Sequence, residues 1–293
     1  MSIRLGANPI IWSNDDLREL GAETSLETCL TQAREVGFEG MELGHKFPRE
    51  PAALAAVLAP FGLKCVSGWY SARLRERDAR AELAQLRPHL ELLKALGSEV
   101  LVFADVSGAV HGDLARALSA RPRLEPGEWR EFGRRVTEVA AATAGEGVRL
   151  VYHHHMGTLV QSEADIDALM EATGEAAGLL LDTGHAAFAG ADPSALARRH
   201  GARIAHFHAK DVRAEVRERA VREDWSFLRA VLAGVFTVPG DGSVDFARVF
   251  TALPGYRGWV VLEAEQDPRR ADPLTYATLG YRNLRKLLAE TLP

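Results

Sequence analysis

The most constraining feature of this sequence is a unit that recurs along the chain: an amphipathic helix, a glycine and a short apolar strand. Helices expected at 52–61 and 80–96 end at Gly62 and Gly97, and a strand is expected directly after each. A glycine that ends a helix before a strand is typical of right-handed βα units. The expected strands cover residues 3–7, 40–43, 63–66, 100–103, 149–151, 179–181, 204–208 and 259–262.

About eight strands that alternate with helices predict an α/β fold, a single (β/α)8 TIM barrel over residues 1–293. No linker rich in Pro, Ser or Gly divides the chain. Residues 213–242 form a segment longer than an ordinary loop after a strand. This segment predicts an insertion after the seventh strand, either a solvated helix or a lid over a site.

Composition narrows the class of protein further. A chain of 293 residues with 47% hydrophobic residues can bury a large core, and its net charge of −5 argues against nucleic acid or an anionic membrane as partner. Cys29 and Cys65 lie in apolar runs, so we expect no disulfide and a reducing compartment. Without a signal-peptide pattern or a long apolar span, the sequence predicts a soluble cytoplasmic protein.

Three consecutive histidines, His153, His154 and His155, follow the apolar run 149–151. Side chains alternate along a strand, so His153 and His155 share one face and His154 points the other way. Packing alone explains three adjacent imidazoles poorly, because a buried neutral ring needs a partner for each nitrogen. The run therefore indicates a polar site at the end of a strand.

Polar residues also follow three later strands: Asp182, then His206 or His208, then Glu263. The active site of such a barrel lies at the carboxyl ends of its strands. Mixed carboxylate and imidazole ligands suit a divalent metal that keeps positions open for substrate oxygens. Taken singly, these residues could instead cap a helix, bind backbone groups or pair with arginine; taken together, they predict a metal site.

Four further residues are candidates at neighbouring positions. Glu42 and Lys46 flank the end of the second strand, and Lys46 is either a ligand for a substrate oxygen or a surface lysine. Trp12 either stacks on a ring substrate or belongs to the core. His185, three residues after Asp182, is a candidate acid or base, with helix capping or packing as the alternative.

With these residues assembled, the sequence resembles the xylose-isomerase-like barrel superfamily and, within it, the myo-inosose-2 dehydratase family. The resemblance spans nearly the whole chain, and the Gly-His-Lys-Phe-Pro string at 44–48 and the triple histidine are among its most specific parts. The other matching segments are residues 8–15, 181–185, 206–211, 237–242 and 263–268. Transferred by position, the superfamily's metal ligands fall on His153, Asp182, His208 and Glu263, where His153 replaces a glutamate.

The resemblance implies removal of water from 2-keto-myo-inositol (scyllo-inosose) to give a trihydroxycyclohexane-dione, through a metal-stabilised enolate. It implies Co²⁺ or Mn²⁺ and a glutathione requirement. In this scheme His185 and Lys46 are catalytic, while Asn8, Trp12, Glu42 and His155 bind the substrate, a small polyol ketone. The alternative is a metal-dependent isomerase or epimerase of an inosose or ketose, and a homo-oligomer is compatible with either.

Overall fold

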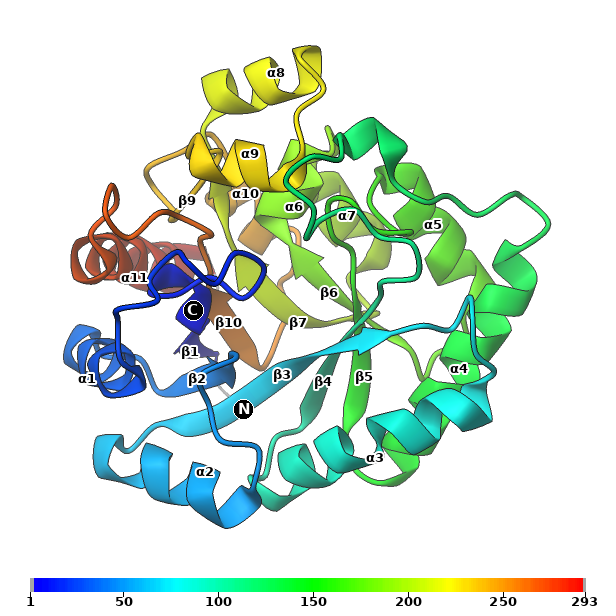
Figure 1. Ribbon diagram of the computed structural model, residues 1–293, viewed down its shortest axis with the longest axis horizontal. Coiled ribbons are helices and arrows are strands. Elements are labelled where there is room, and N and C mark those ends of the chain that lie inside the picture. The colour runs from blue at the N-terminus through cyan, green and yellow to red at the C-terminus, as the bar shows by residue number, and fades with distance from the viewer. Residues whose placement is uncertain (1–2, 292–293) are drawn as a thin grey trace.

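In the computed structural model, which describes residues 3–291, eight parallel strands close into a barrel in the order β1-β10-β7-β6-β5-β4-β3-β2 (Figure 1). This arrangement confirms the predicted fold class. The barrel strands are β1 (Arg4–Ala7), β2 (Gly40–Leu43), β3 (Lys64–Ala72), β4 (Val100–Asp105), β5 (Arg149–His153), β6 (Gly178–Asp182), β7 (Ile204–Ala209) and β10 (Trp259–Leu262).

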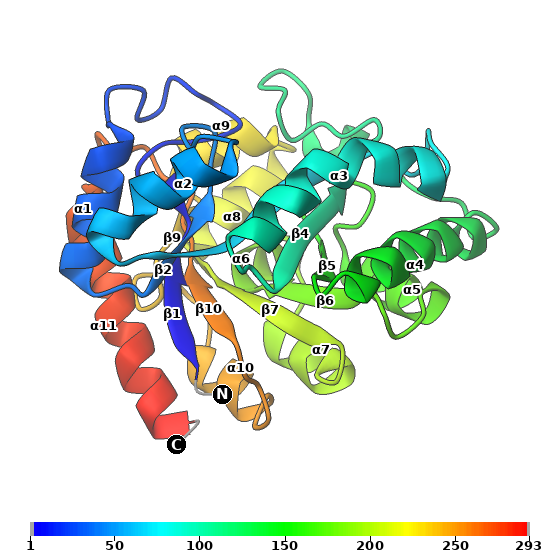
Figure 2. The ribbon, with the colours of Figure 1, turned by 90° about the horizontal axis from the view of Figure 1, so that it is seen from below.

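Helices surround the strands, as Figures 1 and 2 show. Their apolar faces pack on the barrel, and the main core lies in the layer between strands and helices. The helices of this layer are α1 (Leu26–Val36), α2 (Pro51–Leu58), α3 (Ala79–Ala95), α4 (Trp129–Gly145), α5 (Glu163–Ala172), α6 (Thr183–Phe188), α7 (Pro193–His200), α10 (Phe246–Thr251) and α11 (Pro273–Thr291).

Local sequence sets where these helices begin and end. Ser25 caps α1 by accepting a hydrogen bond from the Thr28 backbone, and Gly37 ends it with φ +108°, a conformation that favours glycine. Ser162 and Asp165 form a capping box at the start of α5. These βα units therefore carry local start or stop signals.

An insertion follows β7, as the length of segment 213–242 predicts. It contains β8 (Asp211–Val212), α8 (Ala214–Arg222), α9 (Phe227–Leu232) and β9 (Phe236–Thr237), and β8 pairs with β9 in an antiparallel ribbon. A second apolar cluster fixes this insertion to the barrel, with Trp225, Phe227 and Phe236 among its buried members. In Figure 1, α8 projects from the rim.

Two long loops rise at the end of the barrel opposite the two termini (Figure 2). One follows β1 and the other follows β4, which ends at Asp105. The loop after β4 pairs with the insertion through a bridge between Ala117 and Ser226. Among the described residues, no helix is both long enough and apolar enough to span a membrane.

Candidate active site

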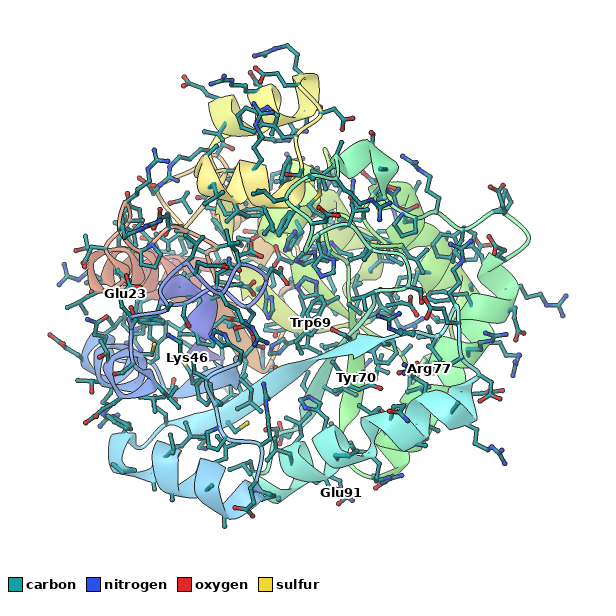
Figure 3. The ribbon with its side chains drawn as sticks, viewed as in Figure 1. Glu23, Lys46, Trp69, Tyr70, Arg77 and Glu91 are labelled. Carbon is teal, nitrogen blue, oxygen red and sulfur yellow. The ribbon has the colours of Figure 1, made fainter. Side chains whose placement is uncertain are left out.

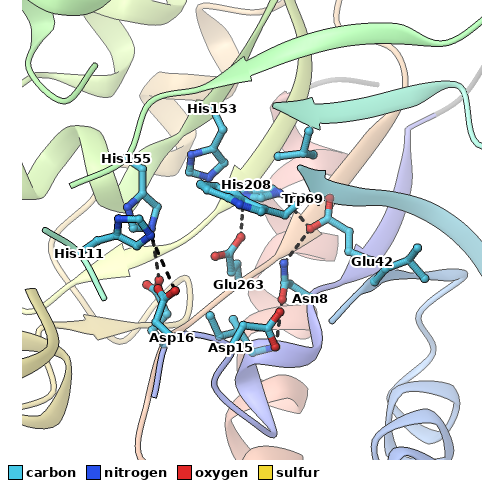
Figure 4. A pocket seen from close by; sticks show the side chains of 14 residues that line it. Asn8, Asp15, Asp16, Glu42, Trp69, His111, His153, His155, His208 and Glu263 are labelled. Atoms are coloured by element: carbon cyan, nitrogen blue, oxygen red, sulfur yellow. Dashed lines mark hydrogen bonds and ion pairs between the residues drawn. The ribbon is translucent and has the colours of Figure 1, made fainter. Parts of the chain in front are cut away.

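A pocket of about 90 Å³ opens at the carboxyl ends of the strands (Figure 4). Residues from six barrel strands or the segments just after them meet there with the loops after β1 and β4. The pocket is lined by Asn8, Ile10, Asp15, Asp16, Glu42, Leu43, Trp69, Val102, His111, His153, His155, His208, Glu263 and Glu265. Its position is the one expected of an active site in this architecture.

The four predicted metal ligands converge at the floor of this pocket. One ligand atom from each of the four side chains lies within 4.8 Å of the other three. Asp182 Oδ2 is 3.6 Å from His153 Nε2 and 3.5 Å from His208 Nδ1, and His208 Nδ1 also contacts Glu263 Oε2. All four side chains are buried. The set is His153, Asp182, His208 and Glu263.

The chemistry of these atoms fits a metal ion. Asp182 Oδ1 accepts a hydrogen bond from the His185 backbone and so caps α6, while Oδ2 is buried 3.5 Å from Lys210 Nζ and has no hydrogen-bond partner within residues 3–291. His208 Nδ1 and Glu263 Oε2 contact each other, but neither forms a hydrogen bond of regular geometry with a described residue. Unpartnered buried acceptors are costly unless another group binds them, and two imidazoles with two carboxylates suit a first-row divalent ion. Asp182 can thus cap a helix and bind a metal at once.

Glu42 supports this set from behind. Its carboxylate accepts hydrogen bonds from Asn8 Nδ2 (2.8 Å) and Ser67 Oγ (2.6 Å), and it lies 2.8 Å from His206 Nε2. It is also 3.1 Å from His208 Nε2. A carboxylate on the far nitrogen of a metal-binding histidine fixes the tautomer and orientation of the ring. Glu42 and Asn8 therefore orient His208, although both also line the pocket.

A lysine that the sequence analysis did not select lies beneath the ligands. Lys210 is fully buried, and its Nζ lies 2.7 Å from Glu265 Oε2, 2.9 Å from Glu263 Oε1 and 3.0 Å from His185 Nε2. Its aliphatic part passes Gly184, where an ideal Cβ would be only 2.4 Å from Lys210 Cγ. Only glycine leaves this space, so the Gly in Asp-Thr-Gly-His makes room for an internal cation.

Charges and burial together set the pKa values of the ligands. Burial opposes ionisation of Glu263, but His208 and Lys210 outweigh it and lower its pKa to about 2. Burial also opposes a charge on His208, yet Glu263 and Glu42 raise the pKa of that ring well above its usual value. His153 is dominated by burial, which lowers its pKa to about 4. The ligand set thus combines anionic carboxylates with a basic imidazole, that of His208, and a weakly basic one, that of His153.

His155 lies beside the ligands with a different set of contacts. Its Nδ1 is 2.8 Å from the Met156 carbonyl oxygen, and its Nε2 is 3.7 Å from Glu265 Oε1. The His185 ring lies against it at a centroid distance of 3.8 Å, tilted by 44°, and Phe227 packs at 5.0 Å. His155 lines the pocket, as predicted for a residue that faces the substrate, while His154 points away and accepts a hydrogen bond from the Asp182 backbone.

The two long loops add an acid and an imidazole to the pocket mouth. Asp16, in the loop after β1, has its Oδ1 3.8 Å from Nε2 of His111, in the loop after β4. Burial raises the pKa of Asp16 to about 6 and lowers the pKa of His111 to about 3. The His111 ring also meets the His155 ring edge-on at 5.2 Å. These residues extend the site beyond the strand ends.

Three predicted site residues outside the ligand set do not line the pocket. Lys46 donates hydrogen bonds to the carbonyls of Gly21 (2.7 Å), Ala22 (3.2 Å) and Thr24 (2.5 Å), and so holds the end of the loop after β1. Figure 3 shows it on the α1 side of the barrel, apart from Trp69.

Trp12, the second, is fully buried, and its Nε1 donates to Gln32 Oε1. His185, the third, is fully buried behind His155. In the structure, Lys46 supports a loop, Trp12 belongs to the core, and His185 contacts pocket residues without lining the pocket.

Sequence reasoning missed residues of two kinds. Lys210 and Glu265 follow the ligands His208 and Glu263 by two positions, so the alternation that joined His153 to His155 could have found them. Trp69 was missed because β3 continues to Ala72 rather than ending at Val66. Asp16 and His111 lie in irregular loops, whose conformations no periodic pattern predicts.

An eight-stranded parallel barrel with a ligand set at the carboxyl ends of its strands defines the class of this protein. The chain belongs to the xylose isomerase-like TIM barrel family, whose model matches residues 30–287. It is 51% identical over 291 residues to the rhizopine catabolism protein MocC of Rhizobium meliloti, covering 99% of this chain and 90% of the relative. It is 40% identical to the inosose dehydratase of Geobacillus thermodenitrificans, covering 97% of each.

Solved structures share the fold at low sequence identity. The probable 3-DHS dehydratase AsbF from Bacillus anthracis superposes with a TM-score of 0.70 at 14% identity, over 96% of this chain and 98% of that one. The IOLI protein with a binding zinc atom gives a TM-score of 0.65 at 15% identity, over 99% and 98%. At these identities the likeness concerns the fold alone.

Proposed function

We propose that this chain is a hydro-lyase that removes water from an inosose, 2-keto-myo-inositol, to give a cyclohexane-dione. One observation carries the proposal. The chain is 40% identical over nearly its full length to an inosose dehydratase, and four possible metal-ligand atoms and the imidazole of His155 meet at one pocket. Similarity over 97% of both chains supports the same reaction class, and the pocket provides the groups that the reaction needs.

His153, Asp182, His208 and Glu263 would hold the divalent ion. When bound, the ion supplies Lewis-acid stabilisation of the negative charge that develops on the ketone oxygen. Imidazole and carboxylate together favour a first-row ion such as Mn²⁺, Co²⁺ or Zn²⁺ over Ca²⁺. Glu42 and Lys210 keep His208 and Glu263 oriented toward that position.

The pocket lining supports an uncharged polyol as substrate. Five carboxylates, from Asp15, Asp16, Glu42, Glu263 and Glu265, face it, and no described lysine or arginine does. A phosphate or carboxylate group on a substrate would therefore meet repulsion with no lysine or arginine side chain among the described lining residues to offset it, which leaves the bound metal ion as its only cationic partner there. Hydroxyl groups, in contrast, can donate to these oxygens, and the Trp69 ring provides an apolar face for the carbon ring.

The direct test supplies 2-keto-myo-inositol to the purified protein loaded with Mn²⁺, Co²⁺ or Zn²⁺, with and without glutathione. We expect dione absorbance to appear and the substrate to lose one water by mass. The same reaction in D2O, followed by NMR, measures exchange of the proton next to the ketone. Exchange without loss of water would instead support the isomerase or epimerase, and neither reaction with any ion would overturn the proposal.

A further inference from the structure

We propose that His155 is the base that removes the proton next to the ketone, with Nε2 as the accepting atom. This inference rests on the proposed function and assigns a catalytic residue within it. It replaces the sequence-based expectation that His185 is the proton-transfer residue. Three structural observations carry it: the hydrogen bond at Nδ1, the packing of the ring, and the contacts of the competing groups.

The hydrogen bond at Nδ1 fixes the tautomer of His155. The Met156 carbonyl oxygen, 2.8 Å from Nδ1, can only accept, so Nδ1 carries a proton. In the neutral ring the lone pair therefore resides on Nε2. The turn that follows is itself fixed, because the His155 backbone donates to Val160 and its carbonyl accepts from Thr158 Oγ1.

Aromatic neighbours hold the ring in this orientation. Trp69 and His111 meet it edge-on at 5.5 Å and 5.2 Å, and Phe227 packs at 5.0 Å. The ring of the ligand His153 lies 5.5 Å away between centroids. The basic nitrogen is thus held beside the position where the ketone oxygen would be stabilised, as proton removal at the adjacent carbon requires.

The competing groups are already engaged. His185 has the Met156 backbone N–H facing Nδ1 at 3.3 Å and Lys210 Nζ facing Nε2 at 3.0 Å, and it does not line the pocket. Glu265 does line the pocket, but its Oε2 already accepts a hydrogen bond from the Lys210 ammonium at 2.7 Å. His155 Nε2 is instead directed at Glu265 Oε1, 3.7 Å away, and within residues 3–291 it has no hydrogen-bond partner shorter than that contact.

The step balances without any further reactant. The C–H bond next to the ketone breaks, its proton moves to His155 Nε2, and its electron pair forms the enolate. The enolate then restores the ketone and forms a carbon–carbon double bond, while the C–O bond on the next carbon breaks. The double bond carries the hydroxyl of the carbon that lost the proton, so this product is an enol that tautomerises to the dione. The departing hydroxide takes the proton from the imidazolium and leaves as water, which returns His155 to its neutral form.

The test compares His155→Gln with the wild-type enzyme. Glutamine keeps a donor for the Met156 carbonyl but has no basic nitrogen. We expect dehydration and exchange of the substrate proton with D2O to fall together by about 10²- to 10⁴-fold. The bound-metal ratio and the circular dichroism spectrum should not change. Loss of metal from this variant would make His155 a ligand and would overturn the assignment.

Two further measurements keep the proposal falsifiable. In the metal-free wild-type protein, ¹⁵N NMR should show a protonated Nδ1 and a free Nε2 for His155, and the opposite tautomer would overturn it. His200→Gln, on α7 and outside the pocket lining, is the matched histidine variant and should retain proton exchange. Exchange that persists in His155→Gln and disappears in Glu265→Gln would assign the base to the carboxylate instead. If the wild-type enzyme neither exchanges the substrate proton nor dehydrates the substrate, the proposed function itself is overturned.

Discussion

His153 and His155 are two residues apart, point to the same side of the barrel and line the same pocket, yet their surroundings differ. His153 has Nε2 directed at the Asp182 carboxylate, within the ligand set. His155 has Nδ1 held by a backbone carbonyl and Nε2 directed at Glu265. The pocket therefore has two halves, a metal half of His153, Asp182, His208 and Glu263, and a proton-transfer half around His155 and Glu265.

The comparison teaches that the partner behind an imidazole sets its role. In the metal half, a carboxylate lies behind the ring of His208, and this carboxylate strengthens the ring as a ligand. In the proton-transfer half, a neutral carbonyl fixes the tautomer of His155 without adding charge. Lys210 contacts Glu263 in one half and Glu265 in the other, so it couples the two.

The largest expected effect comes from Asp182→Asn. Asparagine can still cap α6 through Oδ1, so folding should persist, but the charged ligand atom Oδ2 is lost. Loss of a residue that contacts a metal ligand, rather than the metal itself, typically lowers metal affinity by roughly 10- to 100-fold. Loss of the ligand atom of Asp182 should lower it by more, and turnover should fall with it. Metal analysis after dialysis measures this effect. Asp192→Asn, at the cap of α7, is the matched control; full metal content in Asp182→Asn would contradict the metal half.

Glu42→Gln should have a smaller effect on the same half. Asn8 and Ser67 donate to different oxygens of Glu42, so glutamine keeps one of these two hydrogen bonds and loses the charge behind His208. Metal affinity should decrease by roughly 10- to 100-fold, as is usual for such outer partners. Competition with a chelator measures it. Glu39→Gln, an exposed neighbour, should leave the affinity unchanged. A raised KM with normal metal affinity would instead make Glu42 a substrate ligand.

Lys46→Gln separates a supporting role from a catalytic one. The lysine donates to three carbonyls of segment 21–24, so its loss should lower the free energy of unfolding by about 1.5–3 kcal/mol, the range for a hydrogen bond with a charged donor. Urea denaturation measures this change, with the exposed Lys64→Gln as control. A large decrease in kcat at unchanged stability would show that Lys46 takes part in catalysis.

Asp16→Asn should have the smallest effect, and one that depends on pH. Burial raises the pKa of Asp16 from 3.8 to about 6, so the folded state favours the protonated carboxyl. The contribution of Asp16 to the free energy of unfolding of the wild type is fully present below pH 3.8 and is lost as pH rises through about 6. The variant should therefore be more stable than wild type above about pH 6, by at most about 2 kcal/mol for a side chain a quarter exposed, and equal to it at about pH 3.5.

Denaturant titrations of both proteins across this pH range test the Asp16 prediction. A constant difference between Asp16→Asn and wild type at every pH would show that the carboxyl does not titrate differently in the folded state.

The barrel could be predicted because hydrophobic periodicity and helix-ending glycines, such as Gly37 and Gly62, are local signals that recur along the chain. The metal half followed from it, since parallel strands bring their carboxyl ends together whatever the loops do. The proton-transfer half could not be predicted in this way. Which of His155 and His185 faces the pocket depends on the turn after β5, and the position of Lys46 depends on the loop after β1.

Gly184 and Lys210 have a consequence for protein engineering. Their chains pass so closely that no side chain fits at position 184 without displacing the lysine from between Glu263 and Glu265. Substitutions at this floor of the pocket would therefore disturb Lys210 and its two carboxylate partners. The loops after β1 and β4 contribute residues at the pocket mouth instead. A library that seeks new substrates should vary Asp16, His111 and their neighbours, and leave the Gly184–Lys210 crossing untouched.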